Sequence, residues 1–395
     1  MKLFNTLTQS LEDFVPLEDN IVRIYVCGVT PYDTTHLGHA FTYVSFDTLM
    51  RYLEFLGYKI DYVQNVTDID DDILRKSREV GLSWDELGRR ETERFLRDMD
   101  ALNVRRPTVY ARATEEIPAM LEIIQTLVTR GYAYVNEGSV YYSVRQDPDF
   151  GILARAIGLN DYQSMLTIAN ERGNFPDDPR KRDPLDFVLW QAQAPGEPAW
   201  DSPWGPGRPG WHIECSAMSM KYLGPQLDIH GGGADLAFPH HTCEIAQSEH
   251  FTGKVPFSRF WMHTGMVYQG GEKMSKSLGN LTLVSDLLKT YTPDAIRITL
   301  QNHQYRYPWE CSPEDLQFAT ETVDLFQQVR EFVGEQPQGE NRLLHDQFIA
   351  AMNNDLNTPQ ALLLLRQAAE TVILNRDTNT GSEILRLANV LGLRV

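Results

Sequence analysis

Two histidines, His36 and His39, stand three residues apart in the segment His36-Leu37-Gly38-His39. At the start of a helix, imidazoles at this spacing point to the same side, beside free backbone N–H groups and the positive end of the helix dipole. Such a site suits a polyphosphate, and Gly38 removes a side chain that would block a nucleotide. Histidines at helix starts are common, so the segment gains its meaning from the strand expected just before it.

Two lysines lie far downstream, in Lys273-Met274-Ser275-Lys276-Ser277, with glycines on both sides. On a mobile loop, two lysines can fold over a triphosphate and stabilise the charge that develops on departing pyrophosphate. A solvated basic loop is the alternative for any two lysines taken alone. The presence of this segment downstream of the histidine pair in one chain favours the polyphosphate interpretation.

A third set of side chains offers sulfur, nitrogen and oxygen donors to a metal: Cys27, Cys215, His240 and Glu244. His240 and Glu244 are four residues apart and would share one helical face, while each cysteine ends or follows an expected core element. The four could converge as a zinc site. A single cysteine is as readily a small buried hydrophobic residue. The neighbouring pair His241 and Cys243 could also provide ligands.

The elements that would position these residues form a strand–helix–strand unit. The run 21–29 is rich in β-branched residues and reads as a buried strand, and apolar residues recur at helical spacing over 39–56, before Gly57. A second strand is expected over 59–66. This unit predicts an α/β fold with a parallel sheet, whose ligand binds at the carboxyl ends of the strands. A further strand at 227–230 precedes three glycines, 231–233, where backbone could approach a ligand closely.

The remaining patterns suggest four regions. We expect the first half of the catalytic domain over 1–110, an inserted connective subdomain over 111–209, the second catalytic half over 210–285 and a helical domain over 286–395. The insertion should hold a helix at 115–129, strands at 132–135 and 140–144, and a stretch dense in Pro, Gly, Asp and Arg. Helices are expected near 346–352, 358–375 and 382–391.

Composition limits the classes of protein. The chain has 395 residues, 42% of them hydrophobic, which is enough for a large core. The net charge of −18 disfavours non-specific nucleic-acid binding but argues only weakly against tRNA. Four cysteines are too few for a disulfide framework, and no stretch approaches the roughly 18 apolar residues of a membrane span. A cytoplasmic protein is expected.

With its HLGH and KMSKS segments and the run GRPGWHIECSAM over 207–218, the sequence resembles class I cysteinyl-tRNA synthetases and the related cysteine ligases of mycothiol biosynthesis. The resemblance covers essentially the whole chain. Further matching runs are FNTLT (4–8), YVCG (25–28), NVTDIDD (65–71), DFVLW (186–190), DIHGGGADLAFPHH (228–241) and EIAQSE (244–249).

The resemblance implies a Rossmann-like class I synthetase catalytic domain with an inserted subdomain and a C-terminal helical bundle. It implies that the carboxylate of L-cysteine attacks Mg²⁺-ATP to give cysteinyl-AMP, with His36 and His39 on the phosphates and Lys273 and Lys276 on the pyrophosphate. It implies Zn²⁺ on Cys27, Cys215, His240 and Glu244, where the metal selects the thiol of cysteine. Trp211 would border this pocket, and Gly233 and Asp235 would lie near adenosine. Other substrate-binding positions would be Gly28, Thr30, Thr42, Asn65, Thr67, Val267 and Ser275.

The acceptor of cysteine divides the two families. The chain stops at Val395, where synthetases usually continue into an anticodon-binding domain, and Glu171–Pro176 (ERGNFP) is similar to the ERGGDP signature of the mycothiol-type ligase. We therefore expect a small amine acceptor, such as glucosaminyl-inositol. The alternative is a cysteinyl-tRNA synthetase with tRNA as acceptor, which Glu244 and the FNTLT start favour. A third hypothesis, a non-catalytic binding module, is disfavoured by the intact HLGH and KMSKS segments.

Overall fold

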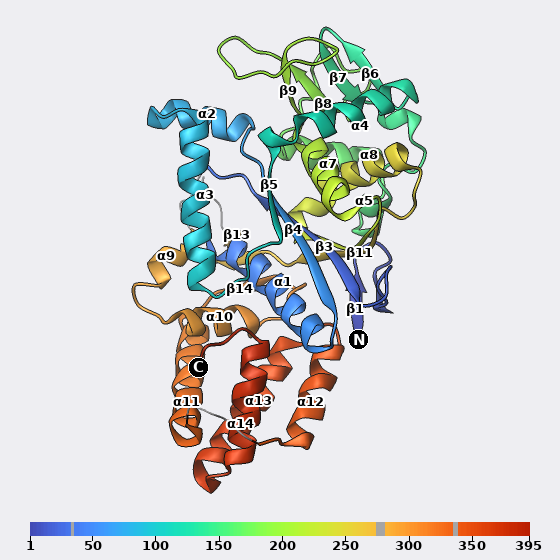
Figure 1. Cartoon of the computed structure of the whole chain (residues 1–395). Coiled ribbons are helices and arrows are strands. Elements are labelled where there is room, and N and C mark those ends of the chain that lie inside the picture. The colour runs from blue at the N-terminus through green and yellow to red at the C-terminus, as the bar shows by residue number, and fades with distance from the viewer. Residues whose placement is uncertain (33–34, 274–280, 335–338) are drawn as a thin grey trace.

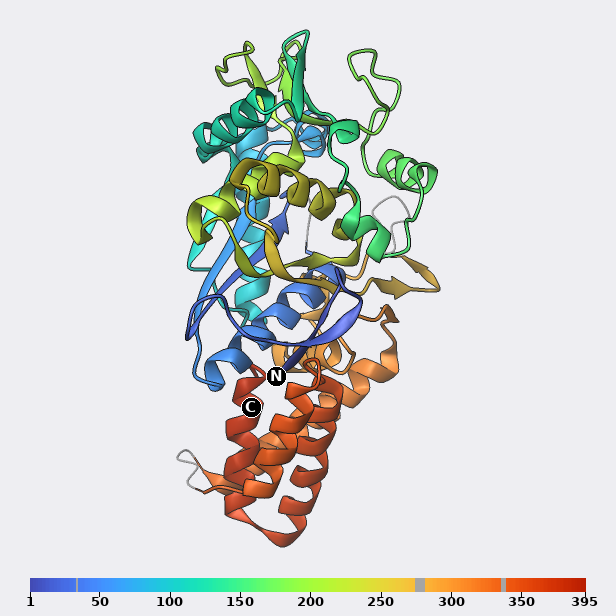
Figure 2. The same cartoon turned by 90° about the vertical axis from the view of Figure 1, so that its right-hand side faces the viewer.

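The computed structural model describes residues 1–32, 35–273, 281–334 and 339–395. The chain has three parts along its length (Figures 1 and 2): a subdomain at one end, an α/β core in the middle and a bundle of helices at the other end. Both termini lie where the core meets the bundle.

A five-stranded parallel sheet forms the core, in the order β11-β10-β3-β4-β5. Its strands are β3 (Ile21–Val29), β4 (Lys59–Val66), β5 (Val109–Arg112), β10 (Leu227–Gly233) and β11 (Ser258–Thr264). Along the chain, β4 and β5 are added on one side of β3, and β10 and β11 are added later on its other side. The strand order therefore reverses between β3 and β10, which is where ligands bind in open parallel sheets. The expected α/β fold is confirmed.

Helix α1 (Leu37–Phe55) connects β3 to β4 and begins two residues before the expected position. The reason is local: the side chain of His36 caps the helix, and its Nδ1 accepts hydrogen bonds from the backbone N–H groups of Gly38 (3.1 Å) and His39 (3.4 Å). Gly57 follows with a φ of +98°, as a residue after a helix end often does.

The inserted subdomain contains a four-stranded antiparallel sheet, in the order β6-β7-β8-β9. Its elements are α4 (Ile117–Thr129), β6 (Ala133–Asn136), β7 (Ser139–Tyr142), α5 (Ile152–Ala156), α6 (Tyr162–Glu171), β8 (Phe187–Ala192) and β9 (Gly207–Pro209). The expected start at residue 111 falls inside β5, which belongs to the core sheet as far as Arg112. The far boundary coincides with the end of β9.

Helices dominate the chain after the core sheet: α9 (Val284–Leu287), α10 (Pro293–Gln301), α11 (Pro313–Val333), α12 (Arg342–Asn353), α13 (Thr358–Asn375) and α14 (Thr378–Val390). The range of α13 matches the expectation, whereas α12 and α14 each begin four residues earlier. Polar caps explain the difference, because Asn341 and Asp377 accept hydrogen bonds from backbone N–H groups in the first turns. Smaller elements are the hairpin β1 (Lys2–Asn5) and β2 (Ser10–Asp13), the helices α2 (Asp71–Val80) and α3 (Trp84–Ala101), and the sheet of β12 (Val267–Gln269), β13 (Glu272–Lys273) and β14 (Trp309–Glu310).

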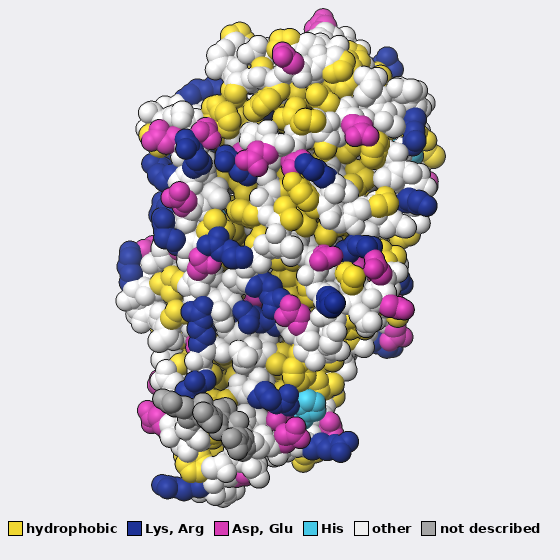
Figure 3. Space-filling model, viewed as in Figure 1, with side chains coloured by type: hydrophobic (Ala, Val, Ile, Leu, Met, Phe, Trp, Pro, Cys, Tyr) yellow, Lys and Arg dark blue, Asp and Glu magenta, His cyan; other side chains and the backbone are white. Residues whose placement is uncertain are grey.

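Two apolar cores flank the main sheet. One joins α1 to the C-terminal bundle, and the other joins the insertion to α7 (Trp211–Leu223) and α8 (Thr242–Thr252). On the face shown in Figure 3, basic and acidic side chains are interspersed on much of the surface. Across the described ranges, no helix combines the length and the apolar character that a bilayer crossing requires.

Candidate active site and metal centre

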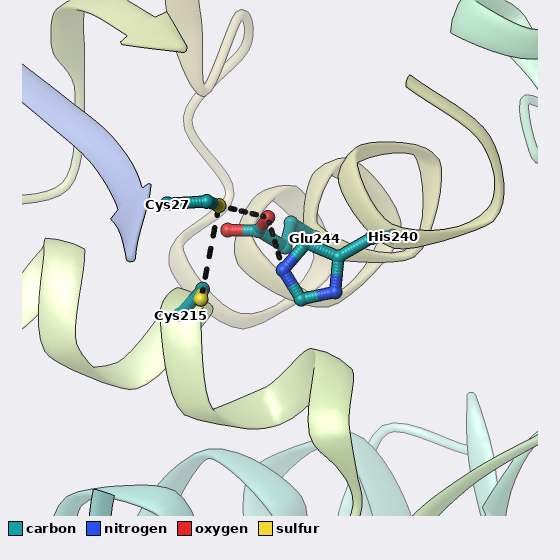
Figure 4. A group of neighbouring side chains, drawn as sticks. All are labelled: Cys27, Cys215, His240 and Glu244. Atoms are coloured by element: carbon teal, nitrogen blue, oxygen red, sulfur yellow. Dashed lines mark hydrogen bonds and ion pairs between the residues drawn. The ribbon is translucent and has the colours of Figure 1, made fainter. Parts of the chain in front are cut away.

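Four elements bring the expected metal ligands together (Figure 4). Cys27 lies near the end of β3, Cys215 in the second turn of α7, His240 in the short helical segment η4 (Ala237–His241) and Glu244 in α8. All four side chains are buried, and their ligand atoms lie within 4.8 Å of one another. The Sγ of Cys27 is 3.8 Å from the Sγ of Cys215 and 3.7 Å from Oε1 of Glu244. The same Oε1 of Glu244 is 3.2 Å from Nε2 of His240.

A second buried set overlaps the first and shares Cys27 and Glu244 with it. Its other members are His230, on β10, and His241. Nε2 of His241 is 3.3 Å from the Sγ of Cys27, and Nε2 of His230 is 3.4 Å from Oε2 of Glu244. The sequence indicates His241 as a possible metal ligand, whereas it gives no such indication for His230. Cys243 is buried but belongs to neither set.

Further aromatic side chains fix the orientation of these imidazoles. Nδ1 of His240 lies 2.9 Å from Nδ1 of His212, and the Trp211 ring stacks on His240 with centroids 4.2 Å apart. Nδ1 of His241 lies 2.8 Å from Nε2 of His263, whose other nitrogen meets Oγ1 of Thr6 at 2.9 Å. Metal-binding histidines typically have such a partner on the second ring nitrogen. Trp211 therefore borders the cluster through its stacking on His240.

The electrostatics of the cluster fit a divalent cation. Burial raises the pKa of the Cys27 thiol and of the Glu244 carboxyl well above their ordinary values, and it lowers the pKa of His230 to about 3. The imidazoles are therefore neutral and able to bind metal. In this buried position, ionised thiolates and an ionised carboxylate are stable only beside a positive charge. Two thiolates, an imidazole and a carboxylate form a ligand set that zinc binds.

The two histidines of the HLGH segment lie at the N-terminus of α1. Their rings are stacked, with centroids 3.7 Å apart and an interplanar angle of 23°, so they face the same side as expected. A Cβ at Gly38 would lie 3.0 Å from the His36 ring, so glycine at this position makes room for the capping imidazole. Tyr43 lies further along α1, and its hydroxyl donates a hydrogen bond to the backbone carbonyl of Cys27 on β3 (3.0 Å).

The segment that follows the lysine loop pairs with the HLGH segment. The carbonyl of Thr282 accepts a hydrogen bond from the N–H of Leu37 (2.8 Å), and the N–H of Val284 donates to the carbonyl of Thr35 (3.1 Å). Lys273 ends β13, paired with Tyr268. Ser275 and Lys276 lie outside the described residues. The chain on the C-terminal side of the loop is thus anchored to the start of α1.

Three expected substrate-binding residues meet at the carboxyl ends of β3 and β4. The N–H of Gly28 donates to Oδ1 of Asn65 (2.6 Å), and Nδ2 of Asn65 donates to Oγ1 of Thr67 (3.2 Å). A Cβ at Gly28 would lie 1.7 Å from the carbonyl oxygen of Asn65, so only glycine allows this approach. Thr30 follows β3 immediately. These residues occupy the edge of the sheet where a nucleotide or amino acid would bind.

Two other expected residues join neighbouring elements. Oγ1 of Thr42, on α1, lies 2.7 Å from Oγ1 of Thr264, at the end of β11. Val267 is buried in β12. Both side chains are buried.

The glycine run 231–233 differs from its expected role. It continues β10, and a Cβ at Gly231 would lie 2.0 Å from the Phe46 ring of α1, while one at Gly232 would lie 2.7 Å from Leu236. These two glycines therefore allow close packing within the protein. Gly233 ends the strand, beside Asp235 in the short helix η3 (Ala234–Leu236).

Comparisons with known proteins agree with this architecture. The family model described as "tRNA synthetases class I (C) catalytic domain" matches residues 13–321. A protein named cysteine–tRNA ligase from Thermodesulfovibrio yellowstonii is 47% identical over 386 residues, which cover 92% of this chain and 77% of that one. A cysteine–tRNA ligase from Dehalococcoides mccartyi is 44% identical over 405 residues, covering 100% and 86%.

Solved structures show the same fold at low identity. Mycobacterium tuberculosis methionyl-tRNA synthetase, in complex with methionyl-adenylate, superposes with a TM-score of 0.66 at 14% identity, covering 94% of this chain and 89% of that one. The Agrobacterium radiobacter LeuRS-tRNA-LeuAMS complex gives 0.65 at 13% identity, covering 96% and 84%.

These matches do not support the expected closeness to the mycothiol-type ligases. That expectation rested on where the chain ends and on the six residues Glu171–Pro176, which form the end of α6 and the turn after it. Close identity over nearly the whole chain carries more weight than either feature, and it favours the alternative interpretation. The chain belongs to the class I cysteinyl-tRNA synthetase family and is an ATP-dependent ligase.

Proposed function

We propose that this chain is a cysteine–tRNA ligase, which activates L-cysteine with Mg²⁺-ATP and transfers the cysteinyl group to tRNA. One observation carries the proposal: the buried cluster of two thiols, an imidazole and a carboxylate lies at the end of β3, and the same strand leads into the HLGH helix. A site selective for a thiol and a site for polyphosphate thus lie close together in the chain, because Cys27 and His36 are nine positions apart. The names of the most similar relatives agree with this activity.

Activation needs position more than covalent chemistry from the protein. The carboxylate of cysteine attacks the α-phosphate, and pyrophosphate leaves with its electron pair. The paired imidazoles of His36 and His39 face the phosphates from the start of α1, where backbone N–H groups and the helix dipole add positive potential. Lys273 and Lys276 neutralise the leaving pyrophosphate. Gly233 and Asp235 bind the adenosine at the end of β10.

The choice of cysteine rests on the metal cluster. When bound by Cys27, Cys215, His240 and Glu244, zinc supplies a soft Lewis acid that prefers a thiolate to a hydroxyl. Trp211, which stacks on His240, forms one side of the pocket for the cysteine side chain and excludes larger amino acids. Gly28, Asn65 and Thr67 hold the backbone of the substrate at the neighbouring strand ends.

Transfer completes the reaction. A ribose hydroxyl of tRNA attacks the mixed anhydride of cysteinyl-AMP, and AMP departs. The net charge of −18 requires local contacts for the RNA, since the surface as a whole repels phosphate. We place the reaction in the cytoplasm, where the four cysteines, all unpaired in the structure, would remain reduced.

The acceptor is tested by direct labelling. Purified protein is incubated with ATP and radiolabelled cysteine, then given either tRNA for cysteine or glucosaminyl-inositol. We expect label on the tRNA and none on the small amine. Label on glucosaminyl-inositol alone would restore the mycothiol-type interpretation, and formation of cysteinyl-AMP without transfer to either would refute the acceptor while leaving activation intact.

A further inference from the structure

A pocket opens beside Gly233 and Asp235, the residues proposed to bind adenosine, where the core, the N-terminal hairpin and the loop before β14 meet. Its cavity volume is about 270 Å³, and its lining includes Thr6, Gln9, Ala234, His263, Arg306 and Tyr307. Ala234 immediately precedes Asp235, so the pocket adjoins the site where cysteinyl-AMP would form. None of the roles proposed above uses Arg306 or Tyr307.

The pocket is unusual in its charge. Arg306 is the charged side chain in its lining, and no carboxylate lines it among the described residues. Arg306 is ion-paired with Asp355, which does not line the pocket, so Arg306 is the charged group in the lining that can donate to an anion.

Arg306 forms an ion pair with Asp355, which lies in the loop between α12 and α13. Oδ2 of Asp355 accepts a hydrogen bond from Nε of Arg306 (2.7 Å), and Oδ1 accepts from the N–H of Phe4 and the hydroxyl of Tyr305, both at 2.8 Å. The Asp355 side chain is 5% exposed, against 25% for Arg306. The carboxylate therefore holds the guanidinium through Nε, and Arg306 also lines the pocket.

Two aromatic rings complete this arrangement. The guanidinium carbon lies 4.6 Å from the ring centroid of Phe4 and 4.3 Å from that of Tyr307. Among the described residues, the hydrogen bond of the Arg306 guanidinium is the one from Nε to Asp355, and its terminal nitrogens form none. A preorganised guanidinium with unused planar donors matches the geometry of a phosphate group. Tyr307, which is 53% exposed, offers a ring for stacking at the pocket mouth.

We propose that this pocket binds a backbone phosphate of the tRNA acceptor, with Arg306 donating from its terminal nitrogens and Tyr307 packing against the adjoining nucleotide. The inference rests on the proposed function, because it takes RNA to be the acceptor. It adds a contact outside the catalytic segments, which would hold the polynucleotide next to the adenylate. Stacking on an exposed ring tolerates any base, so the contact contributes affinity and not sequence selectivity.

ATP is the other source of phosphate in this reaction, and the test separates the two. Arg306→Gln removes the charge, and Arg366→Gln is a matched control in the helical bundle. Arg366 also packs over an aromatic ring (4.5 Å from the Phe318 centroid), is 20% exposed and lies 3.3 Å from Glu321, but it lies outside the pocket lining. Tyr307→Ala is a second variant that removes an exposed side chain and spares the fold.

We measure tRNA binding over a range of salt concentrations, together with cysteine-dependent pyrophosphate exchange, which needs no tRNA. Arg306→Gln should raise the Kd for tRNA about ten- to a hundredfold and lower the salt slope by about one, while exchange and its KM for ATP stay unchanged. Tyr307→Ala should raise the Kd about tenfold, and Arg366→Gln should change neither quantity.

Other outcomes overturn the inference. A raised KM for ATP in Arg306→Gln would assign the pocket to the nucleotide substrate. Unchanged tRNA affinity and salt slope in a variant that charges tRNA normally would reject the RNA contact and leave the proposed function standing. Wild-type protein that activates cysteine but binds no tRNA would refute both.

Discussion

The Sγ atoms of Cys27 and Cys215 lie 3.8 Å apart, although the two residues are 188 positions apart in the sequence. This distance is well beyond the roughly 2.05 Å of a disulfide, so the sulfurs are neighbours without a bond. Cys27 lies near the end of β3, and Cys215 lies in α7, where the chain returns from the insertion. The cluster therefore joins the two halves of the catalytic core at the point where the strand order reverses.

Zinc binding should depend on both of these cysteines. We expect about one zinc per chain in purified protein, and a large loss of metal in Cys27→Ser or Cys215→Ser, because serine is a poor zinc ligand. Metal analysis by mass spectrometry measures this directly. Cys311→Ser is the matched control, since Cys311 lies outside both ligand sets, and it should keep its zinc. Wild-type levels of zinc in both cysteine variants would reject the cluster as the metal site.

The two overlapping ligand sets make different predictions for histidine variants. If zinc binds the set with Cys215, His240→Ala should lower zinc affinity by more than a factor of ten, whereas His230→Ala should have a smaller effect through loss of packing. The set with His230 and His241 predicts the reverse order. Competition with a chelator of known affinity measures both. We expect His240 to dominate, because its set includes both thiols.

Several features of the fold could be predicted because local sequence dictates them. Strands β3 and β4 have their expected bounds, since each is a run of β-branched and aromatic residues closed by polar or glycine residues. The start of α1 was placed two residues late because His36 is an uncommon N-cap. In α14 the first turn, 378–381, has no large apolar residue, so apolar periodicity does not predict it, and its start is set by the polar cap Asp377. The start of α12 is likewise set by its cap, Asn341.

The parts of the site that depend on tertiary contacts could not be predicted from the sequence. His230 was missed because a single histidine in a strand gives no spacing signal; its proximity to Cys27 arises from the pairing of β10 with β3. Gly231 was assigned to ligand approach, although what requires glycine there is the Phe46 ring on α1. Arg306 and Asp355 are 49 residues apart and became a unit only in the fold.

His36 has two roles that substitutions can separate. Asparagine is a good N-cap residue, so His36→Asn should keep the cap of α1, whereas His36→Ala should also lose about 1 kcal/mol of stability. Both variants should slow cysteine-dependent pyrophosphate exchange by about a hundredfold, as expected for loss of one preorganised donor to the transition state. Normal exchange in His36→Asn would show that the imidazole serves only as a cap.

The pH dependence of stability should reveal Asp70, which caps α2. Burial, followed by repulsion from Asp72 and Asp71, raises the pKa of Asp70 to about 7. Below pH 4 this carboxyl is protonated in both states. Between pH 4 and 7 it ionises only in the unfolded state, so its contribution to stability is lost as the pH rises through the folded pKa.

Asp70→Asn should therefore become more stable relative to wild type as the pH rises from 4 to 7, by up to about 4 kcal/mol, and the gain should level off above pH 7. Asparagine can still accept the hydrogen bond from the N–H of Ile73, so the cap is kept. Urea unfolding at a series of pH values gives this difference. A difference that is constant with pH would show that Asp70 ionises with an ordinary pKa.

The most direct measurement compares cysteine with serine in ATP–pyrophosphate exchange, before and after removal of zinc by a chelator. The account predicts exchange that depends on cysteine, a preference over serine of at least about a thousandfold, and loss of cysteine-dependent exchange without zinc that returns when zinc is added back. No cysteine-dependent exchange in the zinc-loaded protein, or equal exchange with serine, would contradict it.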